Sequence, residues 1–234
     1  MTDLGWMELQ VEALFESDGG GRLVAVRGPG GARPAPRFFF GRTRHGALWR
    51  FRADVPEPRV AELARLASRE ALDWPLDELP ERFEAFRAAL EADAPIAEVH
   101  HGPAYRFGET PTPAPDPEVV ALTPDRAALL GPEWAELAAS LRARQPCAAV
   151  VREGRAVSAC YVARRSARAA EAGVRTLPPH RGRGLATRAV AAWAAAVAGA
   201  GLVPLYSTGW SNRASRAVAA RLGLIPYGTD LALR

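Results

Sequence analysis

The chain has 234 residues, of which 48% are hydrophobic, and its net charge is +4 with arginine as the only strongly basic residue. This length and composition suffice for a packed core, but the longest apolar run, 189–201, is too short to span a bilayer. With no secretory signal visible, we expect a cytoplasmic location, no membrane partner and free thiols at the two cysteines. The cysteines and the four histidines lack metal-ligand spacing, so we expect no metal.

The N-terminal half mixes helical and strand patterns. Met7, Val11 and Leu14 have helical spacing, and a Gly-rich turn precedes the strand-like run 23–26. Residues 38–40 and 48–51 predict a strand pair, and two further helix faces are carried by Val60, Leu63, Leu66 and Ala67 and by Phe83, Phe86 and Leu90. We find no chemical motif here, and we interpret His100 and His101 as ordinary strand-end or loop residues.

Four prolines at alternate positions mark residues 109–117 as an extended linker. We therefore divide the chain into an N-terminal mixed α/β domain, 1–108, and a C-terminal domain, 118–234. The N-terminal domain could shape a substrate pocket or be a diverged copy of the second.

The C-terminal half predicts a strand at 119–122, one or two helices at 124–144, and strands at 147–151 and 156–162 joined by a turn at Glu153 and Gly154. A strand at 171–176, interrupted by Gly173, precedes a helix at about 182–200. A strand at 203–208, a helix at 211–222 with Gly223 as its cap, and a terminal strand pair from Ile225 complete the pattern.

A strand, a turn with Gly182 and Gly184, and a long helix form a common device for binding pyrophosphate. The unpaired amides and the positive dipole end of the helix point at the anion. A dinucleotide-binding fingerprint would need Gly or Ala where Thr187 stands and a carboxylate on the strand 205–207. A nucleoside-triphosphate loop would need a lysine, which this chain lacks.

Arg181, Gly184 and Ala186 match the signature Arg/Gln-x-x-Gly-x-Gly/Ala, and with it the C-terminal half resembles the GNAT acyltransferases. A second block, 212–215 continuing to 221–224, resembles the last helix and following strand of that family. The order of elements from 119 to 233 also matches. The resemblance implies an α/β (α+β) fold with a mixed, largely antiparallel sheet flanked by helices, preceded by the smaller N-terminal domain.

The resemblance also implies a site for acetyl-CoA as co-substrate, with no metal. The residues that it assigns to CoA binding are the strand residues Val174, Arg175 and Thr176, the loop and helix residues Gly182, Arg183, Gly184, Leu185, Ala186 and Thr187, and Asn212 at the start of the last helix. Asn212 can equally be an N-cap that serves only its own helix.

Two groups that many family members use in catalysis are missing. Ala219 stands where a tyrosine would protonate the departing thiolate, and Ser207 stands where some members carry a glutamate base. An amine of pKa about 10.4 costs about 4.6 kcal/mol to deprotonate at pH 7, whereas a thiolate leaving group costs at most about 2 kcal/mol, so the base matters more. Glu171 is our candidate base, although we expect Arg175 to lower its pKa; His180 is a weaker candidate.

We therefore predict an N-acetyltransferase that transfers an acetyl group from acetyl-CoA to a primary amine, on a small molecule or a peptide, by direct attack in a ternary complex. Val174 would supply a main-chain N–H for the oxyanion, and Tyr206 or Tyr227 could be a displaced acid.

One alternative is an inactive acyl-CoA-binding regulatory module. A second, a nucleic-acid-binding protein that uses the arginines of 152–188, lacks interleaved aromatic residues, so we expect no nucleic-acid partner. The acceptor and the oligomeric state are left open.

Overall fold

The computed structural model describes residues 1–29, 33–108 and 116–234. Most of the linker expected at 109–117 lies outside these described residues. Within them, no helix is long and apolar enough to cross a membrane.

The N-terminal half mixes helices and strands, as its apolar spacing predicts. Its elements are α1 (Asp3–Leu14), β1 (Phe15–Ser17), β2 (Leu23–Val26), β3 (Arg33–Pro34), β4 (Phe38–Thr43), β5 (Gly46–Phe51), α2 (Glu57–Ala67), α3 (Phe83–Glu91) and β6 (Val99–Arg106). His100 and His101 lie inside β6.

The C-terminal half begins with β7 (Val119–Ala121). The next segment, where one or two helices are predicted, contains one short α-helix, α4 (Ala135–Ser140), and the 3-10 helices η1 (Pro124–Leu129), η2 (Pro132–Trp134) and η3 (Leu141–Arg144). There follow β8 (Cys147–Arg152), β9 (Arg155–Arg165), β10 (Ala169–Thr176), η4 (Pro178–His180), α5 (Leu185–Gly199), β11 (Val203–Ser207), α6 (Arg213–Arg221) and β12 (Ile225–Leu233). The turn between β8 and β9 has positive φ at Glu153 and Gly154, which suits a tight hairpin.

One nine-stranded sheet joins the two halves of the sequence, in the order β5-β4-β12-β6-β11-β10-β9-β8-β7. All of its neighbours are antiparallel except β10 and β11. The N-terminal strand β6 lies between β11 and β12, and β12 in turn pairs with β4. The expected domains 1–108 and 118–234 therefore share a sheet, while β1, β2 and β3 form a small sheet of their own.

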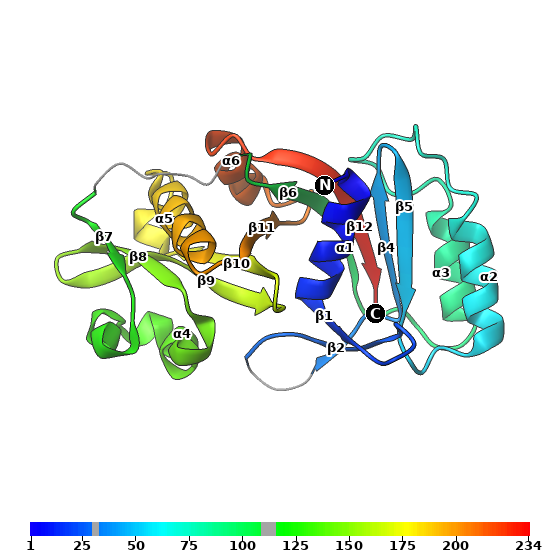
Figure 1. Cartoon of the computed structure of the whole chain (residues 1–234), viewed down its shortest axis with the longest axis horizontal. Coiled ribbons are helices and arrows are strands. Elements are labelled where there is room, and N and C mark those ends of the chain that lie inside the picture. The colour runs from blue at the N-terminus through cyan, green and yellow to red at the C-terminus, as the bar shows by residue number, and fades with distance from the viewer. Residues whose placement is uncertain (30–32, 109–115) are drawn as a thin grey trace.

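Helices cover both faces of the large sheet (Figure 1). Side chains alternate across a strand, so Leu205 packs against Leu9 and Ala13 of α1, whereas Tyr206 faces the core formed with Trp193 of α5. Helices α2 and α3 cover the phenylalanine-rich end formed by β4 and β5. Helix α1 therefore lies over the middle of the sheet, on the face opposite α5.

Two sequence-based expectations are wrong. Strand β10 runs through Gly173 without interruption, because the absent side chain makes room for Tyr161; an added Cβ would lie 2.5 Å from the Tyr161 Cε2 atom. The C-terminal residues form one strand, Ile225–Leu233, and no terminal strand pair, because the partners of that strand come from the N-terminal half.

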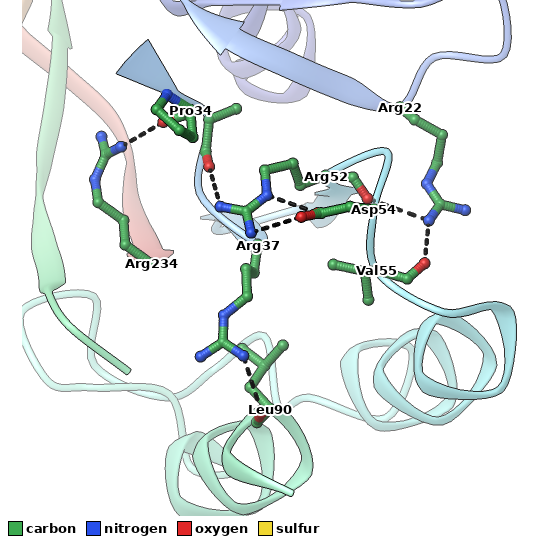
Figure 2. A network of polar contacts seen from close by, with 9 residues as sticks. Arg22, Pro34, Arg37, Arg52, Asp54, Val55, Leu90 and Arg234 are labelled. Atoms are coloured by element: carbon green, nitrogen blue, oxygen red, sulfur yellow. Dashed lines mark hydrogen bonds and ion pairs between the residues drawn. The ribbon is translucent and has the colours of Figure 1, made fainter. Parts of the chain in front are cut away.

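Arginine side chains stabilise the junctions between elements by donating to main-chain carbonyls (Figure 2). The planar guanidinium offers several donors in a fixed geometry, so one arginine can bind more than one carbonyl. The pairs drawn include Arg37 to Leu90 at 3.0 Å, Arg22 to Val55 at 2.6 Å and Arg234 to Pro34 at 3.0 Å. The last of these attaches the C-terminal residue to β3.

Candidate active site

Strands β10 and β11 part in the middle of the sheet. Their parallel pairing covers Ala169–Val203 to Glu171–Leu205, after which β11 continues beside β6, and β10 continues to Thr176 beside β9. One edge of β10 beyond Glu171 therefore has no strand partner within the described residues. Unpaired main-chain groups at such an edge can bind an extended polar ligand.

The turn after β10 leads into the N-terminus of α5, and no side chain in the described part of the chain caps the first-turn amides of that helix. Gly182 and Gly184 both have φ of +74°, a left-handed conformation that other residues adopt at a cost of about 1 kcal/mol. Gly184 is the N-cap of α5 and offers no side chain to its first turn. The amides of that turn and the positive end of the helix dipole are thus free to bind an anion.

A cavity of about 530 Å³ connects the open edge of β10 with this turn and with α6. Its lining includes nine of the ten residues that the sequence assigns to CoA binding: Val174, Arg175, Thr176, Gly182, Gly184, Leu185, Ala186, Thr187 and Asn212. Arg183 is exposed and is not part of the lining. His180 and Arg181 also line it.

Asn212 has a structural role that is compatible with a place in the cavity wall. Its side chain accepts a hydrogen bond from the Ser215 amide at 3.0 Å, which caps α6. Ser215 also contacts the Tyr206 hydroxyl at 2.7 Å, and burial raises the pKa of Tyr206 to about 12. Burial therefore keeps this hydroxyl protonated at neutral pH.

Glu171 lies where the two strands part. It is 2% exposed, and Oε1 accepts a hydrogen bond from Ser207 Oγ at 2.7 Å. Burial raises its pKa to about 7, against a lowering by the Ser207 hydrogen bond and by the Arg164 charge. The sequence did not predict the contact between Ser207 and Glu171, because it depends on the pairing of β10 with β11.

The expectation that Arg175 lowers the pKa of Glu171 is wrong, because that pKa is raised. Arg175 Nη1 donates to the Glu133 carbonyl at 2.6 Å, and its guanidinium lies 5.1 Å from the Trp134 ring centroid. Its charge is engaged away from Glu171, so desolvation dominates and the pKa of Glu171 rises. A carboxyl that titrates near neutrality is suited to general-base chemistry.

The other candidate groups differ in their surroundings. Tyr227 is 2% exposed and donates to Gln10 Oε1 at 2.8 Å beneath α1. Ala219 is buried and offers no proton. His100, interpreted as an ordinary residue, binds Asp230 at 3.1 Å, and this ion pair raises its pKa. No cluster of three or more potential metal ligands occurs in the described part of the chain.

Residues 143–228 match the family model of the GNAT acetyltransferases. No curated protein sequence shows a significant match. A solved structure described as a putative acetyltransferase of the GNAT family from Novosphingobium aromaticivorans is 25% identical to this chain, with a TM-score of 0.48. The match covers 59% of this chain and 65%, just under two thirds, of the Novosphingobium chain.

Two other solved structures are more distant in sequence. An N-acetyltransferase-like protein from Streptococcus suis is 13% identical with a TM-score of 0.49, over 86% of this chain and 85% of that one. A tandem GNAT protein from the clavulanic acid biosynthesis pathway is 17% identical with a TM-score of 0.44, over 87% and 80%. Such overlaps carry little weight, so the assignment depends on the family match together with the loop signature. By that match, residues 143–228 of this chain are similar to the GNAT acetyltransferase family.

Proposed function

We propose that the protein is an N-acetyltransferase that transfers the acetyl group of acetyl-CoA to a primary amine by direct attack in a ternary complex. The observation that carries this proposal is one continuous cavity that runs along the open edge of β10, the glycine turn and α6. Main-chain amides at a helix N-terminus suit the pyrophosphate, and an open strand edge suits the amide groups of the pantetheine arm.

In the proposed reaction, the amine nitrogen attacks the thioester carbonyl carbon while its proton passes to Glu171. The developing oxyanion accepts a hydrogen bond from a main-chain N–H near Val174, the C–S bond then breaks, and the thiolate takes a proton from water. A pKa of about 7 makes Glu171 a stronger proton acceptor than an ordinary carboxylate while leaving much of it ionised at neutral pH.

The N-terminal half would contribute the acceptor side. Helix α1 covers the face of the sheet on which Glu171 and Leu205 lie, and Leu9 and Ala13 pack against Ala169 and Leu205. Exclusion of water by this helix is the physical reason for the raised pKa of Glu171.

Transfer of labelled acetyl from acetyl-CoA to a panel of primary amines, with release of free CoA thiol measured in parallel, tests the proposal. We expect stoichiometric acetyl-amine and thiol. The buried Ala219, which offers no proton, motivates the alternative of an inactive CoA-binding module. Tight CoA binding with no turnover of any amine would favour that module.

A further inference from the structure

A second, smaller hollow lies where the N-terminal half meets β9. Its volume is about 120 Å³, and its lining includes four arginines and no carboxylate: Arg27, Arg33, Arg144 and Arg164, which we call the arginine hollow. Arg27 and Arg33 come from the N-terminal half, whereas Arg144 and Arg164 come from the C-terminal half. The space suits a small group such as a carboxylate or phosphate.

Two of the four arginines are held in place through Nε, and among the described residues neither donates a hydrogen bond from its Nη atoms. Arg27 Nε donates to the carbonyls of Phe15 at 2.8 Å and Glu12 at 3.1 Å. Arg144 Nε donates to Ser140 Oγ at 2.8 Å, and its guanidinium lies 4.8 Å from the Tyr161 ring centroid. Pre-positioned guanidinium groups bind a planar anion with little further loss of side-chain entropy.

Arg164 forms no direct contact with an acidic group in the described part of the chain. Within residues 1–29, 33–108 and 116–234 its guanidinium has no hydrogen bond or ion pair, and burial lowers its pKa, opposed by the charge of Glu171 and assisted by that of Arg33. Among the described residues, the other three arginines form one ion pair, from Arg27 Nη1 to Glu16 Oε1 at 3.9 Å, and the Glu16 side chain is 57% exposed. A half-buried cluster of like charges is stabilised by a bound anion.

The arginine hollow is adjacent to Glu171. Arg164 is the cross-strand partner of Glu171, and Tyr161 is that of Gly173. Between the pairs Glu171–Arg164 and Ala172–Val162, β9 holds the extra residue Ala163, a β-bulge, and such bulges redirect neighbouring side chains. Cross-strand partners lie roughly 5 Å apart. A small molecule whose anionic group lies in the arginine hollow can therefore reach the Glu171 carboxylate with its amine.

We propose that the arginine hollow binds the anionic group of the acceptor, and that the substrates are primary amines that also carry a carboxylate or a phosphate. This inference rests on the proposed acetyl transfer. The anion would be held over β9 while the amine lies over β10 at Glu171. The N-terminal half then selects the acceptor, because it supplies Arg27 and Arg33.

Matched pairs of amines test the inference and distinguish the two anions. Acetylation of 4-aminobutanoate is compared with that of butylamine, and acetylation of O-phosphoethanolamine with that of ethanolamine. We expect at least one anionic member to have a kcat/KM at least tenfold above its neutral partner. Arg144→Gln should remove most of this preference with little change for the neutral amines, whereas Arg165→Gln, at an exposed position outside the lining, should retain it. Equal rates for anionic and neutral partners would overturn the inference.

A binding measurement separates failure of this inference from failure of the proposed function. With CoA saturating its own site, inorganic phosphate or acetate should raise the melting temperature of the wild type and of Arg165→Gln. The shift should be lost in Arg164→Gln and, as a second variant, in Arg144→Gln. Identical shifts in all four proteins would refute the anion site. An Arg164-dependent shift without acetylation of any amine would refute only the transferase.

Discussion

Replacement of Glu171 by glutamine should affect activity and stability in opposite directions. Glutamine keeps the shape of the side chain and can still accept the Ser207 hydrogen bond, but it cannot take a proton from the amine. We expect kcat/KM to fall by roughly 10² to 10⁴ at neutral pH, with little change in CoA affinity. The loss should shrink as the pH approaches the pKa of the amine, because solvent then supplies the neutral nucleophile.

The magnitude of the stability change follows from the pKa of Glu171. Burial raises that pKa from 4.5 to about 7, so the folded state binds the proton more tightly than the unfolded state. Below pH 4.5 the carboxyl is protonated in both the folded and the unfolded state, so its burial carries no charge penalty. Between pH 4.5 and about pH 7 this penalty grows and lowers the stability of the wild type, and above about pH 7 it is constant. A difference of about 2.5 pKa units corresponds to about 3 kcal/mol. The Glu171→Gln variant should therefore be more stable relative to wild type at about pH 8 than at about pH 4, by up to this amount.

The assay combines pH–rate profiles with denaturant unfolding at two pH values. Glu136→Gln, an exposed substitution on α4, is the matched control and should change neither. A wild-type rate that rises through about pH 7, absent from the variant, would support the base assignment. Parallel profiles of similar height would refute the reasoning and direct attention to His180 or to water near Ser207.

Three further predictions concern the ligands. CoA and acetyl-CoA should raise the melting temperature, while NAD should not; equal stabilisation by NAD would contradict the cofactor assignment. Gly184→Asp should weaken CoA binding at least tenfold in a titration, because φ is +74° there and a negative charge would face the phosphates. Gly184→Ala, which shares the strain but lacks the charge, should bind better than the aspartate variant. Binding to DNA should be weak and should fall steeply with salt in a fluorescence titration, so tight binding at physiological salt would contradict the prediction.

Much of the fold could be predicted from the sequence, because the signals are local. Strand Leu23–Val26 and helix Glu57–Ala67 follow from apolar spacing, and the hairpin at Glu153 and Gly154 follows from turn chemistry. The glycine turn before α5 was predicted from Gly182 and Gly184, since a left-handed backbone favours that residue type. These features depend on neighbours a few positions away, which a sequence displays directly.

Only the tertiary structure decided the features that depend on distant pairing. Strand Val99–Arg106 enters the sheet between β11 and β12, and no local pattern specifies which strands become neighbours. The pKa of Glu171 was expected to be lowered, and it is raised, because α1, more than a hundred residues away in sequence, removes water from that face. The arginine hollow likewise combines residues from both halves of the chain. Apolar periodicity determines the elements, whereas desolvation and the grouping of charges arise only when those elements pack together.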